Sequence, residues 1–188
     1  MLTAVDIARR LADALEVERI EYAIGGAIAL GYYATPRATV DVDINVFVPP
    51  RQGLARVLDV LCRHGFVADR PDTVEKTAVN DGQFRGRIEG IRVDVFVPAI
   101  AYYASLADRK RTVQLLGKPI CVLAPEDLLT LKMMFFRRKD LADVEAVLRG
   151  GEPLDLARVR ETLLDFVGED DPRIREWDTL VGETRGIG

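Results

Sequence analysis

The 188-residue sequence has few of the residues that build redox or zinc sites: two cysteines, Cys62 and Cys121, and one histidine, His64. Two cysteines in apolar surroundings exclude a disulfide framework and a zinc-binding pattern, and we expect both to be buried thiols in a reducing compartment. His64 precedes Gly65 at the expected end of a helix, where its charge would favour the helix dipole rather than catalysis. Other side chains must therefore supply any chemistry.

Long apolar runs are also absent from the sequence. No run approaches the roughly 20 residues that a membrane-spanning helix needs, and residues 1–18 mix charged and apolar residues, unlike a signal peptide. We therefore expect a cytoplasmic protein without membrane contact. The net charge of −4 argues against a broad, nonspecific nucleic-acid-binding surface, but it is compatible with a local basic patch.

The pattern of elements predicts an α+β fold, a small mixed β-sheet flanked by helices with a C-terminal helical extension. We expect the core over residues 1–124 and a helical region over 125–188 that packs on it, because strands give way to helices near Pro125. Residues 66–82 look irregular, with a turn at Asp81-Gly82 that suggests a hairpin tip. The expected strands are 22–24, 41–48, two within 83–97 that join at Glu89-Gly90, and two within 112–122. The first expected helix starts near residue 3, and the others span 27–33, 51–64, 99–110, 125–136, 140–149, 154–167 and 172–181.

Residues 24–46 carry the pattern on which the functional interpretation depends. Gly25-Gly26 stand between a short strand and a helix, where free backbone N–H groups and the absence of a side chain favour an anion. In the following strand, Asp41 and Asp43 alternate with apolar residues, so both carboxylates emerge on one face and the apolar set enters the core. A divalent cation would relieve the repulsion between them, because hard cations bind carboxylate oxygens.

A later strand has the same layout. Ile91, Val93, Val95 and Val97 alternate with a set that includes Asp94. If this strand pairs with the first acidic strand, Asp94 stands on the same surface as Asp41 and Asp43. That adjacency is a hypothesis, since sequence alone does not determine strand pairing.

These segments together resemble the nucleotidyltransferase superfamily of the DNA polymerase β type. The resemblance rests on Gly25-Gly26, Pro36-Arg37-x-Thr39, Asp41-Val-Asp43 and Val93-Asp94-Val-Phe96. Within that superfamily the chain is similar to minimal bacterial nucleotidyltransferases, which include abortive-infection toxins and antibiotic-modifying enzymes. Lys132 and Arg138-Lys-Asp140-x-x-Asp143 resemble a helical signature of the toxin-like branch. One position differs from the family pattern: the family has Gly-Ser in the turn that binds the phosphates, and here the second residue of the pair is Gly26.

The resemblance implies that an acceptor hydroxyl attacks the α-phosphate of a nucleoside triphosphate and that pyrophosphate leaves. Asp41 and Asp43 would hold two Mg²⁺ ions, with Mn²⁺ as a substitute. Asp94 would complete the coordination of the ion nearer the acceptor. Nucleotide binding would fall to Gly25, Gly26, Arg37, Thr39 and Lys132, with Arg138, Asp140 and Asp143 as weaker candidates. The implied partners are an NTP, an acceptor that is an RNA end, a protein or a small molecule, and a cognate antitoxin protein.

Each assignment has a structural alternative. The three aspartates can form the solvated face of amphipathic strands, Arg37 can anchor a turn, and Lys132 can be an exposed helix lysine. Arg138, Asp140 and Asp143 can pair at i,i+3 on a helix surface. The whole chain can also be a nucleotide-binding component of a toxin–antitoxin-type stress system without turnover, or a structural protein. The basic stretches 109–111 and 137–139 hint at a phosphate-bearing acceptor, or are ordinary helix-end charge.

Overall fold

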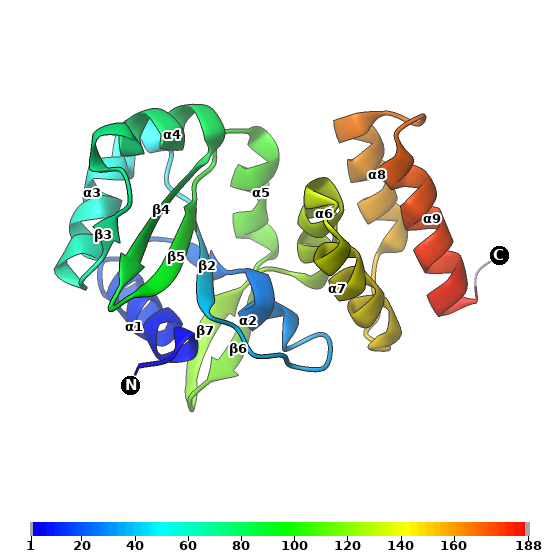
Figure 1. Ribbon diagram of the computed structural model, residues 1–188, viewed down its shortest axis with the longest axis horizontal. Coiled ribbons are helices and arrows are strands. Elements are labelled where there is room, and N and C mark those ends of the chain that lie inside the picture. Colours follow the sequence, from blue (N-terminus) through cyan, green and yellow to red (C-terminus); the bar gives the residue numbers. More distant parts are fainter. Residues whose placement is uncertain (1, 187–188) are drawn as a thin grey trace. The chain divides into compact units, whose positions relative to one another are not determined.

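The computed structural model of the chain describes residues 2–186, and within them the strands form one mixed sheet. The strands are β1 (Tyr22–Ile24), β2 (Asp41–Val46), β3 (Val67–Ala68), β4 (Gln83–Ile88), β5 (Ile91–Phe96), β6 (Arg111–Leu115) and β7 (Lys118–Val122). They lie in the order β3-β4-β5-β2-β1-β7-β6 (Figure 1). β2 runs parallel to β5 and β1 parallel to β7, whereas the other neighbours are antiparallel. The expected α+β fold with a mixed sheet is confirmed.

Helices connect these strands along the chain and follow the last of them. They are α1 (Ala4–Val17), α2 (Gly26–Leu30), α3 (Pro50–Arg63), α4 (Val74–Asp81), α5 (Ala101–Arg109), α6 (Pro125–Phe135), α7 (Arg138–Arg149), α8 (Leu156–Val167) and α9 (Pro172–Arg185), with a 3₁₀ turn η1 at Pro71–Thr73. α1 begins at a capping box, in which the Asp6 N–H donates to Thr3 Oγ1 (3.2 Å) and the Thr3 N–H donates to Asp6 Oδ2 (2.9 Å). None of the helices within residues 2–186 is long and apolar enough to cross a membrane.

The sheet core follows from the two-residue period of the strands. Val42, Ile44 and Val46 of β2 are completely buried, as are Val93 and Val95 of β5. α1 packs against β1, β2 and β7, and its own apolar stripe is buried there. The apolar face of each acidic strand is therefore in the core, as the alternation predicts.

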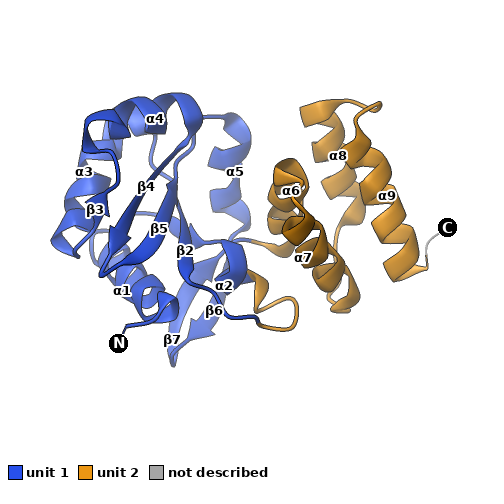
Figure 2. Ribbon diagram, in the orientation of Figure 1, with its two compact units in different colours: residues 1–29, 37–123 blue, residues 30–36, 124–188 orange. Residues whose placement is uncertain are grey.

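The chain divides into two compact units (Figure 2). The first contains residues 1–29 and 37–123, and the second contains residues 30–36 and 124–188. In the second unit, α6 to α9 pack on one another around Trp177, which is 1% exposed. Segment 30–36 belongs to this unit, and a Cβ on Gly150 would lie 2.3 Å from the carbonyl oxygen of Tyr33, so only glycine allows that approach. That the helical region packs on the core stays a prediction.

Three local predictions are wrong. Cys121 is only partly buried. Cys62 is exposed, because it lies on the outward side of α3 beside the buried Leu61. Residues 66–82 are regular after all, since they form β3, η1 and α4. Gly82 has φ +67° and ends α4 rather than forming a hairpin tip. The predicted junction at Glu89-Gly90 is confirmed as a hairpin tip, which joins β4 to β5 with positive φ at both residues.

Candidate functional site

Three adjacent strands place the candidate side chains in two rows on one face of the sheet. Between the parallel strands β2 and β5, Asp43 is the register partner of Asp94 and Asp41 is the partner of Arg92. Across the antiparallel pair of β4 and β5, Arg85 is the partner of Asp94. Register partners project from the same face, so the three carboxylates share one surface with two arginines. The hypothesis that Asp94 stands beside Asp41 and Asp43 is confirmed.

The arginines pair with two of these carboxylates. Arg92 forms an ion pair with Asp41 Oδ2, and its Nε lies 3.1 Å from Asp94 Oδ2. Arg85 donates a hydrogen bond to Asp94 Oδ1, which raises the pKa of the guanidinium. Thr39 Oγ1 donates to Asp41 Oδ1 at 2.7 Å. Every carboxylate oxygen of Asp41 and Asp94 therefore has a cationic or hydroxyl partner.

These pairings bear on the predicted metal site. Within the described residues, no group of three or more His, Cys, Asp or Glu side chains is arranged to hold a metal ion. The donor chemistry still fits a hard divalent cation, because three carboxylates stand at neighbouring positions on adjacent strands. An ion bound by Asp41 and Asp94 would compete with Arg92, which pairs with both carboxylates. The metal-ligand role of Asp41, Asp43 and Asp94 stays a prediction.

The glycine turn is built around Asp43. The Gly25 N–H donates to the backbone carbonyl oxygen of Asp43 at 2.8 Å. Gly26 has φ +53°, and a Cβ at this residue would lie 1.7 Å from Asp43 Oδ2. A serine in this conformation would collide with the carboxylate, which gives a physical reason for glycine where the resembling family has serine. The turn and the first acidic strand thus form one unit, and phosphate binding at Gly25 and Gly26 stays a prediction.

The loop before β2 contains the other two nucleotide-site candidates of the first unit. Arg37 is exposed in this loop, and Thr39 is half-buried. Besides its bond to the carboxylate, Thr39 Oγ1 lies 3.1 Å from the backbone carbonyl oxygen of Asp41. The hydroxyl therefore fixes the start of β2 and the direction of the Asp41 side chain, and a role of either residue in nucleotide binding stays a prediction.

Lys132 lies in the second unit and is held by acidic partners. Its Nζ is 2.5 Å from Asp143 Oδ2 and 3.4 Å from Asp140 Oδ1. Lys132 is buried, so the alternative of an exposed helix lysine is wrong. Asp140 does form an i,i+3 pair, with Arg137, but Asp140 and Asp143 are buried and do not lie on the helix surface as that alternative supposed. Burial opposes the ionisation of Asp140, but the hydrogen bond from Arg137 and the charge of Lys132 outweigh it and lower its pKa.

The paired Lys132 and the exposed Arg138 belong to the helical unit, whereas Asp41, Asp43 and Asp94 belong to the sheet unit. Lys132 already has two carboxylate partners within its own unit. Two of the three N–H donors of its ammonium group are therefore directed at these carboxylates. The roles of Lys132, Arg138, Asp140 and Asp143 in nucleotide binding stay predictions.

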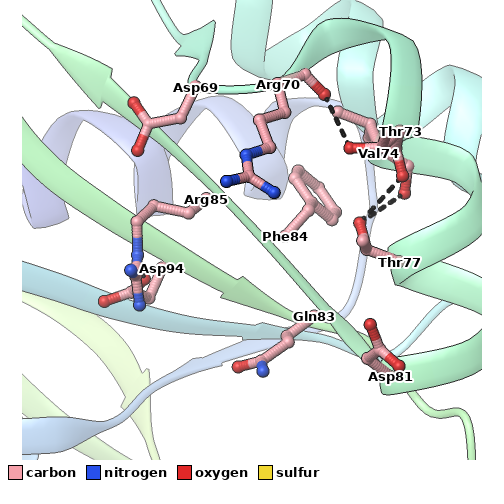
Figure 3. Close-up of a pocket in the computed structure, with 10 residues that line it drawn as sticks. All are labelled: Asp69, Arg70, Thr73, Val74, Thr77, Asp81, Gln83, Phe84, Arg85 and Asp94. Atoms are coloured by element: carbon pink, nitrogen blue, oxygen red, sulfur yellow. Dashed lines mark hydrogen bonds and ion pairs between the residues drawn. The ribbon is translucent and has the colours of Figure 1, made fainter.

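A pocket of about 430 Å³ opens beside Asp94 (Figure 3). The edge of β4 contributes Gln83, Phe84 and Arg85. The remaining lining comes from the segment between β3 and β4: Asp69, Arg70, Thr73, Val74, Thr77 and Asp81. Sequence reasoning missed this pocket because it left residues 66–82 unassigned. The alternation of polar Gln83, Arg85 and Arg87 with buried Phe84 and Ile88 was the available signal.

Comparison of the chain with known proteins identifies its fold. No protein-family model matches the sequence, and no curated protein matches it. Solved structures do match, and those reported below are nucleotidyltransferases or nucleotidyltransferase-like proteins. The chain therefore has a nucleotidyltransferase-like fold, in agreement with the fold that the resemblance implied.

Two proteins represent these matches. An antigenic nucleotidyltransferase-like protein from Paracoccidioides brasiliensis has a TM-score of 0.55 at 18% identity, with 92% of each chain covered. The solution structure of the antibiotic-resistance factor ANT(2'')-Ia has a TM-score of 0.55 at 13% identity, with 97% of this chain and 91% of that chain covered. The crystal structure of ANT(2'')-Ia in complex with adenylyl-2''-tobramycin has the same TM-score and identity, with 97% of each chain covered.

Proposed function

We propose that this chain is a metal-dependent nucleotidyltransferase that moves a nucleoside monophosphate from an NTP to an acceptor hydroxyl or phosphate in the cytoplasm. The observation that carries the proposal is the grouping of Asp41, Asp43 and Asp94 on neighbouring positions of one sheet face, with the Gly25-Gly26 turn against Asp43. The nucleotidyltransferase fold and the adenylylated antibiotic bound to one structural neighbour support it.

Each part of the site has a defined task in this reaction. Asp41, Asp43 and Asp94 would hold Mg²⁺, which when bound polarises the phosphates and stabilises the attacking and leaving oxygens. The Gly25-Gly26 turn accommodates the phosphates of the NTP, because it has no side chains that would block them. Asp94 lines the pocket and would accept the proton of an acceptor hydroxyl once its arginine partners release it.

The arginine pairs favour a second candidate. Because Arg92 and Arg85 hold Asp94, and Arg92 also holds Asp41, the chain could bind a nucleotide and turn it over only slowly. Such a protein would serve as the nucleotide-binding component of a toxin–antitoxin-type stress system, together with a cognate antitoxin. The two candidates share the same nucleotide site and differ in whether pyrophosphate is released.

Thermal shift and pyrophosphate release, measured with each of the four NTPs and Mg²⁺ or Mn²⁺, separate these candidates. We expect a stabilising shift and, with total RNA or a small-molecule acceptor set present, pyrophosphate release. Asp43→Asn should abolish release and leave the fold intact, because the side chain faces away from the core. Asp59→Asn, at an exposed position of α3, is the matched control and should behave like the wild type. A shift without release favours the binding component, and no shift with any NTP refutes both candidates.

A further inference from the structure

The order of the strands gives the site two chemically different sides. On one side of β2 lies β1, which leads directly into the Gly25-Gly26 turn. On the other side lie β5 and β4, which carry Asp94 and Arg85. In phosphoryl transfer the attacking and leaving oxygens stand roughly in line on opposite sides of the phosphorus. If the triphosphate lies at the glycine turn, the acceptor must therefore approach from the β5–β4 side.

The pocket of Figure 3 lies on that side and has Asp94 in its wall. Its volume of about 430 Å³ falls within the range of small-molecule sites, roughly 300–1,000 Å³. It is large enough for a sugar phosphate or a terminal nucleotide and too small for a folded protein surface. Asp94 thus stands between the carboxylates of β2 and a cavity that a small hydroxyl compound can enter.

Two arginines, Arg70 and Arg85, line the pocket together with Asp94. Arg85 of β4 reaches across to Asp94 of β5. Arg70 extends from the segment before η1 toward Phe84 (Figure 3). Arg70 is exposed, and its guanidinium has no partner among the described residues. Two further acidic side chains line the pocket. Asp69 Oδ1 lies 3.7 Å from Arg87 Nε, and Asp81 lies at the end of the pocket away from Arg70.

Charge balance at Asp94 points to an anionic acceptor. At present Asp94 is the counter-charge of Arg85. When Asp94 binds a divalent ion or the acceptor hydroxyl, Arg85 loses this ion-pair partner. The Arg70 guanidinium has no ion pair among the described residues. A phosphate group would satisfy both guanidiniums through charge-assisted, bidentate hydrogen bonds. A polycationic acceptor would instead meet two like charges.

From these observations we propose that the pocket beside Asp94 binds the acceptor, and that this acceptor carries a phosphate ester near its attacking hydroxyl, bound by Arg70 and Arg85. The inference rests on the proposed nucleotidyl transfer. In the reaction, the acceptor oxygen forms a bond to the α-phosphorus, the bond to the β-phosphate oxygen breaks, pyrophosphate leaves, and the hydroxyl proton passes to Asp94 or to water.

Calorimetric binding of three probes to the full chain tests this, in saturating Mg²⁺ and a non-hydrolysable NTP analogue. The probes are ribose 5-phosphate, a dinucleotide with a free 3′-hydroxyl and ribose without phosphate. We expect at least one phosphate-bearing probe to bind at least tenfold more tightly than ribose. Tighter binding of the dinucleotide identifies a nucleic-acid end, and equal or tighter binding of ribose 5-phosphate identifies a free phosphorylated compound.

Two variants make the result specific to the pocket. Arg70→Gln should weaken the phosphate-bearing probe about tenfold, which corresponds to 1.4 kcal/mol, and should leave the affinity for the NTP analogue within about twofold. Arg85→Gln should also weaken the binding of the phosphate-bearing probe. Arg51→Gln, at an exposed arginine of α3 without a partner among the described residues, is the control and should change neither affinity.

The inference is overturned if neither phosphate-bearing probe binds better than ribose, or if Arg70→Gln weakens the NTP analogue as much as the probe. In the second case Arg70 serves the nucleotide and not the acceptor. Failure of the proposed function has a different signature, because the wild-type chain would then either not bind the NTP analogue or bind NTP and release no pyrophosphate with any acceptor.

Discussion

The contact between Gly26 and Asp43 predicts the effect of Gly26→Ala. A Cβ at position 26 would lie 1.7 Å from Asp43 Oδ2, 2.7 Å from Cγ and 3.0 Å from Cβ, so the carboxylate must move. The residue also has φ +53°, a left-handed conformation that costs a non-glycine residue about 1–2 kcal/mol. We expect a loss of at least this much free energy of unfolding, or about 2–8 °C in Tm for a chain of this size.

Gly90→Ala separates the two contributions. Gly90 has φ +84°, but a Cβ there would meet nothing within 4 Å, so this variant has the backbone strain without the collision. Gly26→Ala should therefore be less stable than Gly90→Ala in urea unfolding. Adding Asp43→Ala to Gly26→Ala should recover most of the difference, because it removes the two atoms that the new Cβ approaches most closely.

Binding of Mg–NTP gives the functional readout of the same variants. Displacement of Asp43 should abolish the thermal shift with Mg–NTP in Gly26→Ala, whereas Gly90→Ala should keep it. Equal stability of the two single variants, together with unchanged Mg–NTP binding by Gly26→Ala, would show that the glycine turn does not position Asp43.

Three further predictions concern the buried and paired charges. Lys132→Met removes the buried cation that pairs with Asp143 and Asp140 and should destabilise the chain by about 3–5 kcal/mol in urea unfolding, whereas Lys139→Met on the exposed side of α7 should change stability by less than about 0.5 kcal/mol. Because the pKa of Asp140 is lowered from its ordinary 3.8, its contribution to stability is present above that value and is lost as the pH falls through the lower folded pKa. Asp140→Asn should therefore flatten the pH dependence of unfolding below about pH 4, and an unchanged slope would contradict this assignment. Arg92→Gln removes the guanidinium that competes for two carboxylates and should strengthen Mn²⁺ binding in electron paramagnetic resonance titrations, whereas Arg87→Gln should leave it unchanged and equal affinities would argue against that competition.

Much of the candidate site on the sheet face was predictable because its signals are local. The two-residue period of a strand places Asp41 and Asp43 on one face whatever the strand pairs with, and the same holds for Asp94 within its own strand. The glycine pair between a strand and a helix is likewise a short-range pattern. The exposure of Cys62 was not predictable in this way, because apolar neighbours in the sequence do not tell which side of α3 faces outward.

What lay beyond the sequence depends on residues far apart in the chain. The pairing of β2 with β5 brings Arg92 to Asp41 across 51 positions, and no local pattern encodes that contact. The pocket formed by the segment between β3 and β4 and the buried Lys132–Asp143 pair arise in the same way from packing. The sequence by itself determined which side chains share a strand face, because backbone geometry sets that period. Only the tertiary structure decided which charges meet on that face, because strand order and helix packing are set by the burial of apolar surface over the whole chain.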